Sequence, residues 1–259
     1  FGLEQVVCTP HLGASTSEAQ EKVALQVAEQ MSDYLLTGAV TNALNMPSLT
    51  AEEARRLGPY MKLAELLGSF AGQLTETGVR RLKLEYEGEA AELNTRPLTQ
   101  VALMGFLRPM LAEGVNMVNA PLVARERNIE VTETKHSRGG DYHTLLRFTV
   151  KTDRRERSVA GTLFGGKKPR LVEVKGIAVE AELSPHMLYI TNLDKPGFIG
   201  AVGKIFGDAG INIATFHLGR ADAGGEAIAL LGLDDAVTPQ LLDKVRALPN
   251  IRQATPLRF

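Results

Sequence analysis

Residues 187–219, MLYITNLDKPGFIGAVGKIFGDAGINIATFHLG, decide the fold of the last part of this chain. Met187–Asn192 is an apolar run of strand length, and the turn sequence Asp194–Gly197 follows it. Gly210 is placed to end a helix, and Ile211–Gly219 has the composition of a second strand. The apolar positions of the helix are Ile199, Val202, Ile205, Phe206 and Ala209. This segment therefore predicts a strand–helix–strand unit.

The residues that follow complete a symmetrical pattern. Ala221–Gly225 is a hairpin loop, and Glu226–Leu233 is its second strand. Thr238-Pro239 is typical of a helix start, with the proline at the first helical position. Ile251–Leu257 is a final strand. The order βαββαβ predicts a ferredoxin-like sandwich over residues 185–259.

Residues 46–184 predict an α+β domain of mixed elements. The order of its strands in the sheet cannot be derived from the sequence. The expected helices lie near 51–74, 98–113 and 119–127, and the expected strands near 79–86, 129–135, 142–150, 158–164 and 170–174.

The first 45 residues divide into two parts. Leu3–Pro10 predicts a short buried strand, which is stopped by the proline and suits the last strand of a sheet. A helix follows, because apolar residues recur at every fourth position before Gly38. Those positions are Ala19, Val23, Val27, Met31 and Leu35. We treat residues 1–16 and 17–45 as separate segments.

Composition excludes several classes of protein. The 259 residues are 44% hydrophobic and 23% charged, as in globular domains. A net charge of −1 does not favour nucleic-acid binding, and no apolar run approaches the roughly 20 residues of a membrane helix. Cys8 is the only cysteine, so we expect no intrachain disulfide, no cysteine-rich zinc site and no iron–sulfur cluster. No metal site is predicted from the other residues. These features fit a cytoplasmic protein.

Thr9–Gln20 closely resembles the catalytic-histidine segment of the D-2-hydroxyacid dehydrogenases, in their phosphoglycerate dehydrogenase branch. The resemblance implies that His11 is the general acid–base that exchanges a proton with the substrate hydroxyl. An imidazole suits this role because its pKa lies near the working pH. The plainer alternative is that Pro10–Gly13 is a loop that leads into a helix.

The other catalytic parts of that family do not occur here. Its acidic partner, its substrate-binding arginine and its Gly-x-Gly-x-x-Gly turn are missing. We therefore expect residues 1–16 to end a nucleotide-binding domain that is absent from this chain, and 17–45 to belong to the catalytic body. Residues 46–184 resemble the intervening domain of the longer phosphoglycerate dehydrogenases. NAD, 3-phosphoglycerate and a homo-oligomer, a tetramer in the parent enzyme, are implied by the resemblance.

The terminal sandwich resembles an ACT domain, a ligand-sensing module, through Asn192–Gly197 and Gly210–Ile213. The implied effector is L-serine. Helix N–H groups beside Lys195, Pro196 and Gly197 can hold its carboxylate. Asp194 can attract its ammonium group, and the amides of Asn192 and Asn212 can donate and accept hydrogen bonds. Taken singly, these residues also fit an ordinary turn and a strand start.

A run of cations offers a candidate anion site in the intervening region. Lys167, Lys168 and Arg170 form its centre, and Lys151, Arg154, Arg155 and Arg157 precede them along the chain. A solvated loop is the default interpretation. The resemblance implies an anionic effector here, and Arg170 matches one expected cation, but Ile177 and Glu182 stand where others are expected.

We interpret the chain as the C-terminal regulatory portion of an NAD-dependent phosphoglycerate dehydrogenase that senses L-serine and is inactive alone. The alternative is a free-standing amino-acid sensor, which leaves the match over Thr9–Gln20 unexplained. A serine-dehydratase-type lyase is a weaker rival, because its iron–sulfur cluster needs more than one cysteine.

Overall fold

The structure is a computed structural model that describes residues 2–76, 78–111, 114–137 and 140–259. It contains two compact units, which divide between Arg56 and Leu57. The two units are described separately below.

The first unit is built around α1 (Ser17–Thr37). Gly38 ends this helix in the left-handed conformation with φ 75°, as its position predicts. The predicted strand over Leu3–Pro10 is wrong: these residues form no strand and are exposed. A lone extended segment has no neighbour for its backbone N–H and C=O groups, and no strand among the described residues pairs with it. Phe1 lies outside the described residues.

The second unit begins with a six-stranded sheet in the order β2-β1-β3-β4-β5-β6. The pair β1–β2 is parallel and the other neighbours are antiparallel. The strands are β1 (Val79–Gly88), β2 (Glu130–His136), β3 (Thr144–Thr152), β4 (Glu156–Phe164), β5 (Lys168–Val174) and β6 (Ile177–Ala181). Strand β6 was not predicted from the sequence. Lys175 and Gly176 join it to β5, and both have positive φ, as in the two-residue turns of tight β-hairpins.

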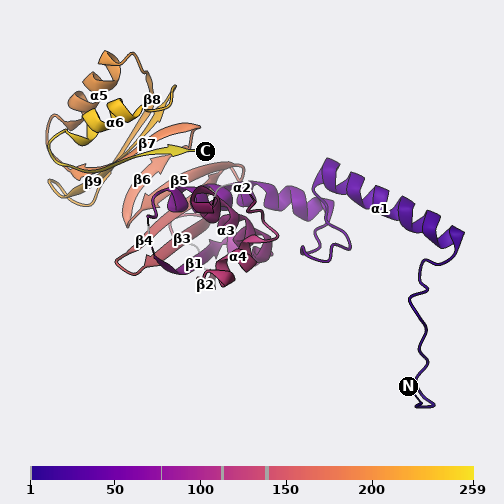
Figure 1. Ribbon diagram of the computed structural model, residues 1–259. Helices are drawn as coiled ribbons and strands as arrows, with labels where there is room; N and C mark the ends of the chain where they lie inside the picture. Colours follow the sequence, from indigo (N-terminus) through magenta and orange to yellow (C-terminus); the bar gives the residue numbers. More distant parts are fainter. Residues whose placement is uncertain (1, 77, 112–113, 138–139) are drawn as a thin grey trace. The chain divides into compact units, whose positions relative to one another are not determined.

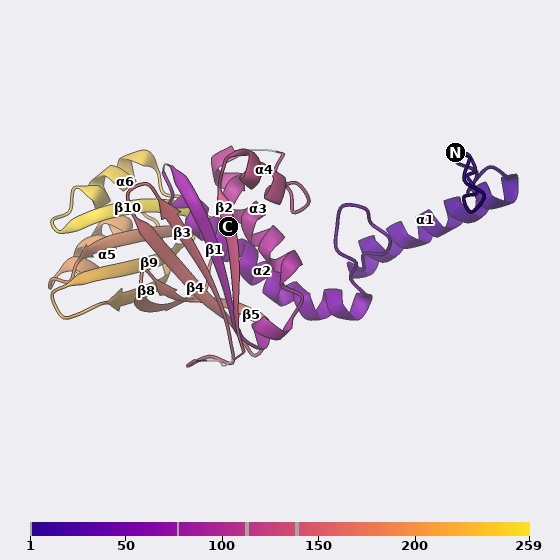
Figure 2. The ribbon, with the colours of Figure 1, turned by 90° about the horizontal axis from the view of Figure 1, so that it is seen from below.

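Two long helices pack against this sheet, as Figure 2 shows. They are α2 (Ala51–Gln73) and α3 (Thr95–Leu111), with a short 3-10 turn at Glu89–Glu92 and α4 (Ala120–Glu126) beside them. The backbones of α2 and α3 touch through Gly68, Gly72 and Gly105. A Cβ atom at Gly68 would overlap the carbonyl oxygen of Ala102. Residues 112–113, at the end of the predicted 98–113 helix, lie outside the described residues.

The last part of the chain forms the predicted sandwich, with helices over one face of a four-stranded sheet (Figure 1). The strand order β10-β7-β9-β8 is that of the ferredoxin-like fold. Its elements are β7 (His186–Leu193), α5 (Phe198–Asp208), β8 (Ile213–Arg220), β9 (Glu226–Leu233), α6 (Pro239–Arg246) and β10 (Ile251–Arg258). Leu188, Ile190, Val202 and Phe206 are at the centre of its core.

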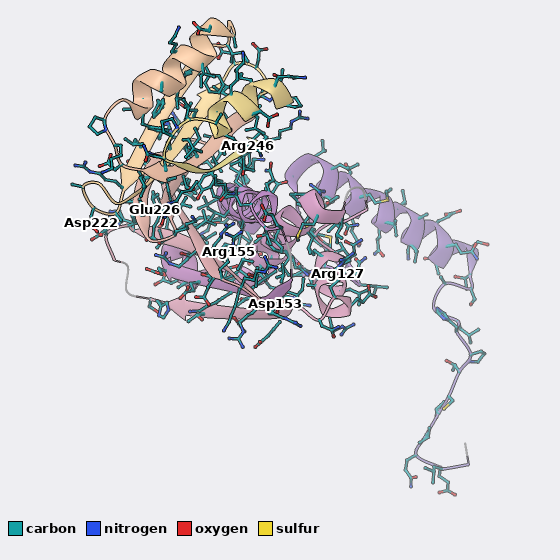
Figure 3. All side chains as sticks on the ribbon, turned by 60° about the vertical axis from the view of Figure 1, so that its left-hand side comes forward. Arg127, Asp153, Arg155, Asp222, Glu226 and Arg246 are labelled. Atoms are coloured by element: carbon teal, nitrogen blue, oxygen red, sulfur yellow. The ribbon has the colours of Figure 1, made fainter. Side chains whose placement is uncertain are left out.

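The other face of this sheet is also buried. Tyr189 of β7 is fully buried and meets Phe70 of α2 edge-on, with ring centroids 5.8 Å apart. Lys175 contacts Glu226 at 3.2 Å, and Figure 3 shows Glu226 on the side of β9 near the six-stranded sheet. A Cβ atom at Gly219 of β8 would overlap the carbonyl oxygen of Ala178. The two sheets therefore pack closely within one unit.

The glycine contact between α2 and α3 can be tested by substitution. We expect Gly68→Ala to lower the free energy of unfolding by about 1–3 kcal/mol, because the added methyl group forces two backbones apart. Chemical denaturation of the purified chain measures this change. Gly203→Ala in α5 is the matched control: its Cβ atom meets nothing within 4 Å, so it should raise stability by up to about 1 kcal/mol. Equal midpoints for the two variants would contradict this packing.

Candidate functional site

The turn Asp194–Gly197 presents an uncapped helix start. Gly197 is the N-cap of α5 with φ 91°, and no described side chain caps the helix. The first N–H groups of α5 thus lack partners in their own helix and can bind an anion. A cavity of about 240 Å³ adjoins them, between this turn and the loop around Asn250. Lys195, Pro196 and Gly197 line it, whereas Asn192, Asp194 and Asn212 do not. This place can hold a small carboxylate.

Asp194 is already engaged within the domain. Its Oδ2 atom accepts hydrogen bonds from Arg220 Nη1 at 2.8 Å and from the Gly224 N–H at 3.2 Å. The bond from Arg220, and then that from Gly224, lower the pKa of the Asp194 carboxyl. A bound ammonium group would therefore share this carboxylate with Arg220. Local sequence patterns do not reveal this ion pair, because 26 residues separate the partners.

Asn192 is held beneath the turn. Its side chain is 1% exposed, and its Nδ2 donates to the carbonyl oxygen of Leu193 at 2.8 Å. Its buried Oδ1 atom has no hydrogen-bond partner among the described residues. Leaving a buried acceptor without a donor costs about 1–3 kcal/mol. This oxygen can accept a hydrogen bond from a donor group of a bound ligand.

Asn212 lies at the other end of the sheet. In the strand register, Asn192 is opposite Ala227 while Ile213 is opposite Leu233, at the two ends of β9. Six residues of strand correspond to about 20 Å. Asn212 is exposed, and its Nδ2 donates to Asp234 Oδ2 at 2.9 Å. One copy of the domain therefore does not bring Asn212 to the Asp194–Gly197 turn.

The predicted anion-site residues lie around the β4–β5 turn. Lys167 and Lys168 are exposed. Arg170 contacts Glu182 at 2.8 Å and lies over the ring of Phe164, 5.7 Å from its centroid. The charge of Arg170 is thus balanced by a neighbour, which leaves the two lysines for an anion.

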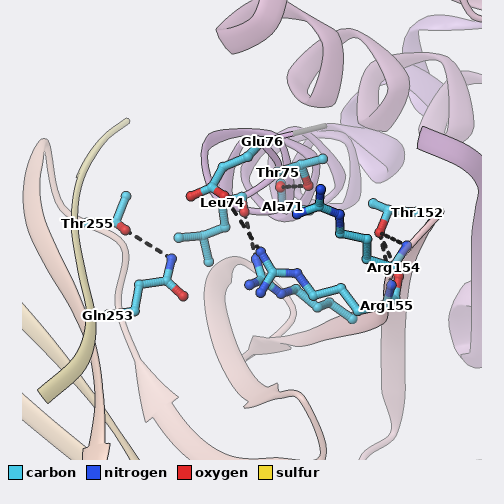
Figure 4. A network of polar contacts seen from close by, with 10 residues as sticks. Ala71, Leu74, Thr75, Glu76, Thr152, Arg154, Arg155, Gln253 and Thr255 are labelled. Atoms are coloured by element: carbon cyan, nitrogen blue, oxygen red, sulfur yellow. Dashed lines mark hydrogen bonds and ion pairs between the residues drawn. The ribbon is translucent and has the colours of Figure 1, made fainter. Parts of the chain in front are cut away.

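The arginines that precede this turn form a different site. Arg154, Arg155 and Arg157 line a cavity of about 280 Å³ beside the end of α2, and Figure 4 shows two of them there. Because β4 separates the β3–β4 turn from the β4–β5 turn, these cations lie at opposite ends of the sheet from Lys167 and Lys168. The sequence predicts one run of cations, and the structure divides that run between these two turns.

His11 is exposed, and no described side chain forms a hydrogen bond with its ring. Its immediate neighbours from Leu3 to Ser15 are exposed as well. No cluster of His, Cys, Asp and Glu within the described residues could hold a metal ion. None of the described helices has the length and hydropathy to cross a membrane.

Two protein-family models match this chain, and their matches correspond to the two parts of the second unit. The sequence model of the D-3-phosphoglycerate dehydrogenase intervening domain matches residues 56–175, and that of the ACT domain matches residues 186–250.

Whole-chain relatives agree with these matches. A D-3-phosphoglycerate dehydrogenase of Methanocaldococcus jannaschii is 39% identical over 99% of this chain and 49% of its own length. Those of Synechocystis and Bacillus subtilis are 40% and 37% identical over 98% and 95% of this chain, and over 46% and 47% of their own lengths. The chain thus spans about half the length of the curated relatives it matches. It belongs to the D-3-phosphoglycerate dehydrogenase family and carries that family's intervening and ACT domains.

Proposed function

We propose that this chain is the regulatory portion of an NAD-dependent D-3-phosphoglycerate dehydrogenase, and that its ACT domain binds L-serine between two copies of the chain. The observation that carries the proposal is the uncapped start of α5, which opens on a cavity of about 240 Å³. Its N–H groups suit the carboxylate of an amino acid, and Asp194, which lies in the same turn but outside the lining of this cavity, is the candidate for the ammonium group.

Strand β8 supports a site shared by two copies. It is an edge strand, with β9 as its paired neighbour in the four-stranded sheet. Edge strands favour pairing across a two-fold axis. Antiparallel pairing of two β8 strands places the start of one beside the end of the other. Asn212 of one copy would then lie near the Arg220–Asp194 pair of the second copy.

The first unit supports a catalytic body around this chain. Helix α1 buries none of its residues, although it carries a regular apolar face. Val23, Val27, Met31 and Leu35 on this face are each at least 45% exposed. A free-standing sensor has no use for such a helix, whereas a neighbouring catalytic domain would cover it. His11, just before α1, would then face the substrate and NAD held by that domain.

Asn212→Ala tests the shared serine site. We expect serine affinity to fall roughly ten- to a hundred-fold, because one hydrogen bond to a charged ligand is lost. Calorimetry measures the affinity, and circular dichroism checks the fold. Asp234→Ala is the matched control, since it removes the partner of Asn212 within the domain but leaves the amide in place. An equal loss of affinity in both variants would assign Asn212 a structural role only.

Mixing two defective variants tests whether the site spans two copies. Asn212→Ala and Asp194→Ala each damage every site in their own homodimers. A mixed dimer would contain one site with both residues intact, so mixing should restore serine binding at about a quarter of the sites. Calorimetry on the mixture after exchange of subunits measures this recovery. If nothing is recovered while mixed dimers form, both residues act within one copy.

The separation of regulation from catalysis can be tested on the same protein. We expect the 259-residue chain neither to oxidise 3-phosphoglycerate nor to bind NAD, because it has no Gly-x-Gly-x-x-Gly turn. Calorimetry with NAD and an absorbance assay for NADH formation measure both properties. Micromolar NAD binding would overturn the assignment of its domains.

A further inference from the structure

We infer that the cavity lined by Arg154, Arg155 and Arg157 is a binding site for a compact dianion such as a phosphate group. This site is separate from the Lys167–Arg170 turn and from the ACT turn, and it does not depend on the function proposed above. The arginines are joined there by Thr75 and Glu76 from the end of α2 and by Thr152 from β3.

The β3–β4 turn holds two of the arginines in place. The hydroxyl of Thr152 accepts hydrogen bonds from the N–H groups of Arg154 and Arg155, at 3.4 and 3.2 Å. Both the hydroxyl and the N–H of Thr152 donate to the Arg155 carbonyl, each at 2.9 Å. Figure 4 shows both side chains extending from this turn toward the end of α2. These hydrogen bonds fix the backbone of the turn, and therefore the points from which the two arginine side chains extend.

The side chain of Arg157 does not form all the hydrogen bonds that it can donate. One terminal nitrogen donates to the carbonyl oxygen of Leu74 at 2.7 Å, but its buried Nε atom has no partner among the described residues. Burial, and then the charge of Arg155, lower the pKa of this guanidinium. An arginine that is partly desolvated beside a like charge is stabilised when an anion binds next to it.

The charge of the cavity matches a dianion. Three arginines face one carboxylate, Glu76, which gives a net charge of +2. Glu76 lies 3.9 Å from Arg155, which is too far for a hydrogen bond, and its side chain is 77% exposed. The three cations come from the β3–β4 turn and the start of β4. Forked guanidinium groups arranged in this way suit the oxygens of a phosphate group better than two separated carboxylates.

The site touches the junction of the two domains. A smaller cavity lies next to the first and shares Thr75, Val150 and Arg157 with it. Tyr189 of β7 also lines this smaller cavity. The hydroxyl of Tyr189 is buried without a hydrogen-bond partner in the described parts of the chain. An anion bound to Arg157 would thus lie one side chain away from the ACT sheet.

Phosphate titration of the intact chain by calorimetry, at constant ionic strength set with sodium chloride, tests the site. Arg155→Gln should weaken phosphate binding about ten-fold or more, because a charge-assisted hydrogen bond is lost. Arg155 is exposed, so this variant should fold normally. Glu76→Gln should tighten binding several-fold, since it removes the opposing charge, and a gain of this kind cannot come from misfolding. Lys62→Gln, which removes an exposed positive charge of α2 that does not line this cavity, is the matched control and should leave the affinity unchanged.

A second titration with 3-phosphoglycerate distinguishes free phosphate from a phosphorylated metabolite as the ligand. Tighter binding of 3-phosphoglycerate that is still lost in Arg155→Gln would identify a phosphate monoester as the ligand. The proposal is overturned if the native chain binds no phosphate. It is also overturned if Lys62→Gln weakens binding as much as Arg155→Gln does. Serine affinity is measured separately, so its failure would not be confused with failure of this site.

Discussion

Burial of both faces of the β10-β7-β9-β8 sheet is the constraint on which the second unit depends. Helices α5 and α6 cover one face around Leu188 and Ile190, and the packing of Tyr189 on Phe70 closes the other. This explains why β9 is apolar almost without interruption, instead of alternating as a half-exposed strand does. With both faces occupied, the edges and the loops are the parts of the sheet that can meet a ligand or a second copy.

The sequence predicted the elements with regular signals and failed where the signal depended on distant residues. The ACT order followed from the glycine and proline positions around α5 and α6, and comparison with known proteins confirmed it. The strand over Leu3–Pro10 was wrong because a strand needs neighbours, and no strand among the described residues pairs with this segment. The ion pair of Asp194 with Arg220 and the separation of Asn192 from Asn212 both depend on strand register, which local patterns do not encode.

Two buried polar atoms without hydrogen-bond partners among the described residues lie where the two domains meet. They are the Nε atom of Arg157 on β4 and the hydroxyl of Tyr189 on β7, and both residues line the same small cavity, whereas Asn192 lies three residues further along β7 on the opposite face of its sheet. Such atoms are costly in a stable core and are expected where a ligand completes the bonding. Strand β7 carries Tyr189, which lines the small cavity next to the arginine cavity, and it ends at the turn of the proposed serine site. That strand gives a short physical route between the two proposed sites.

The close fit of Gly219 against Ala178 bears on how this ACT domain could be used outside its own protein. A ligand-binding domain that folds by itself can be fused to an unrelated protein. Here Met187, Tyr189 and Leu230, each buried in the intact unit, face the intervening domain. A fusion protein that contains residues 185–259 alone would expose these side chains to water as a hydrophobic patch. Such a protein would aggregate unless it also contained the intervening domain.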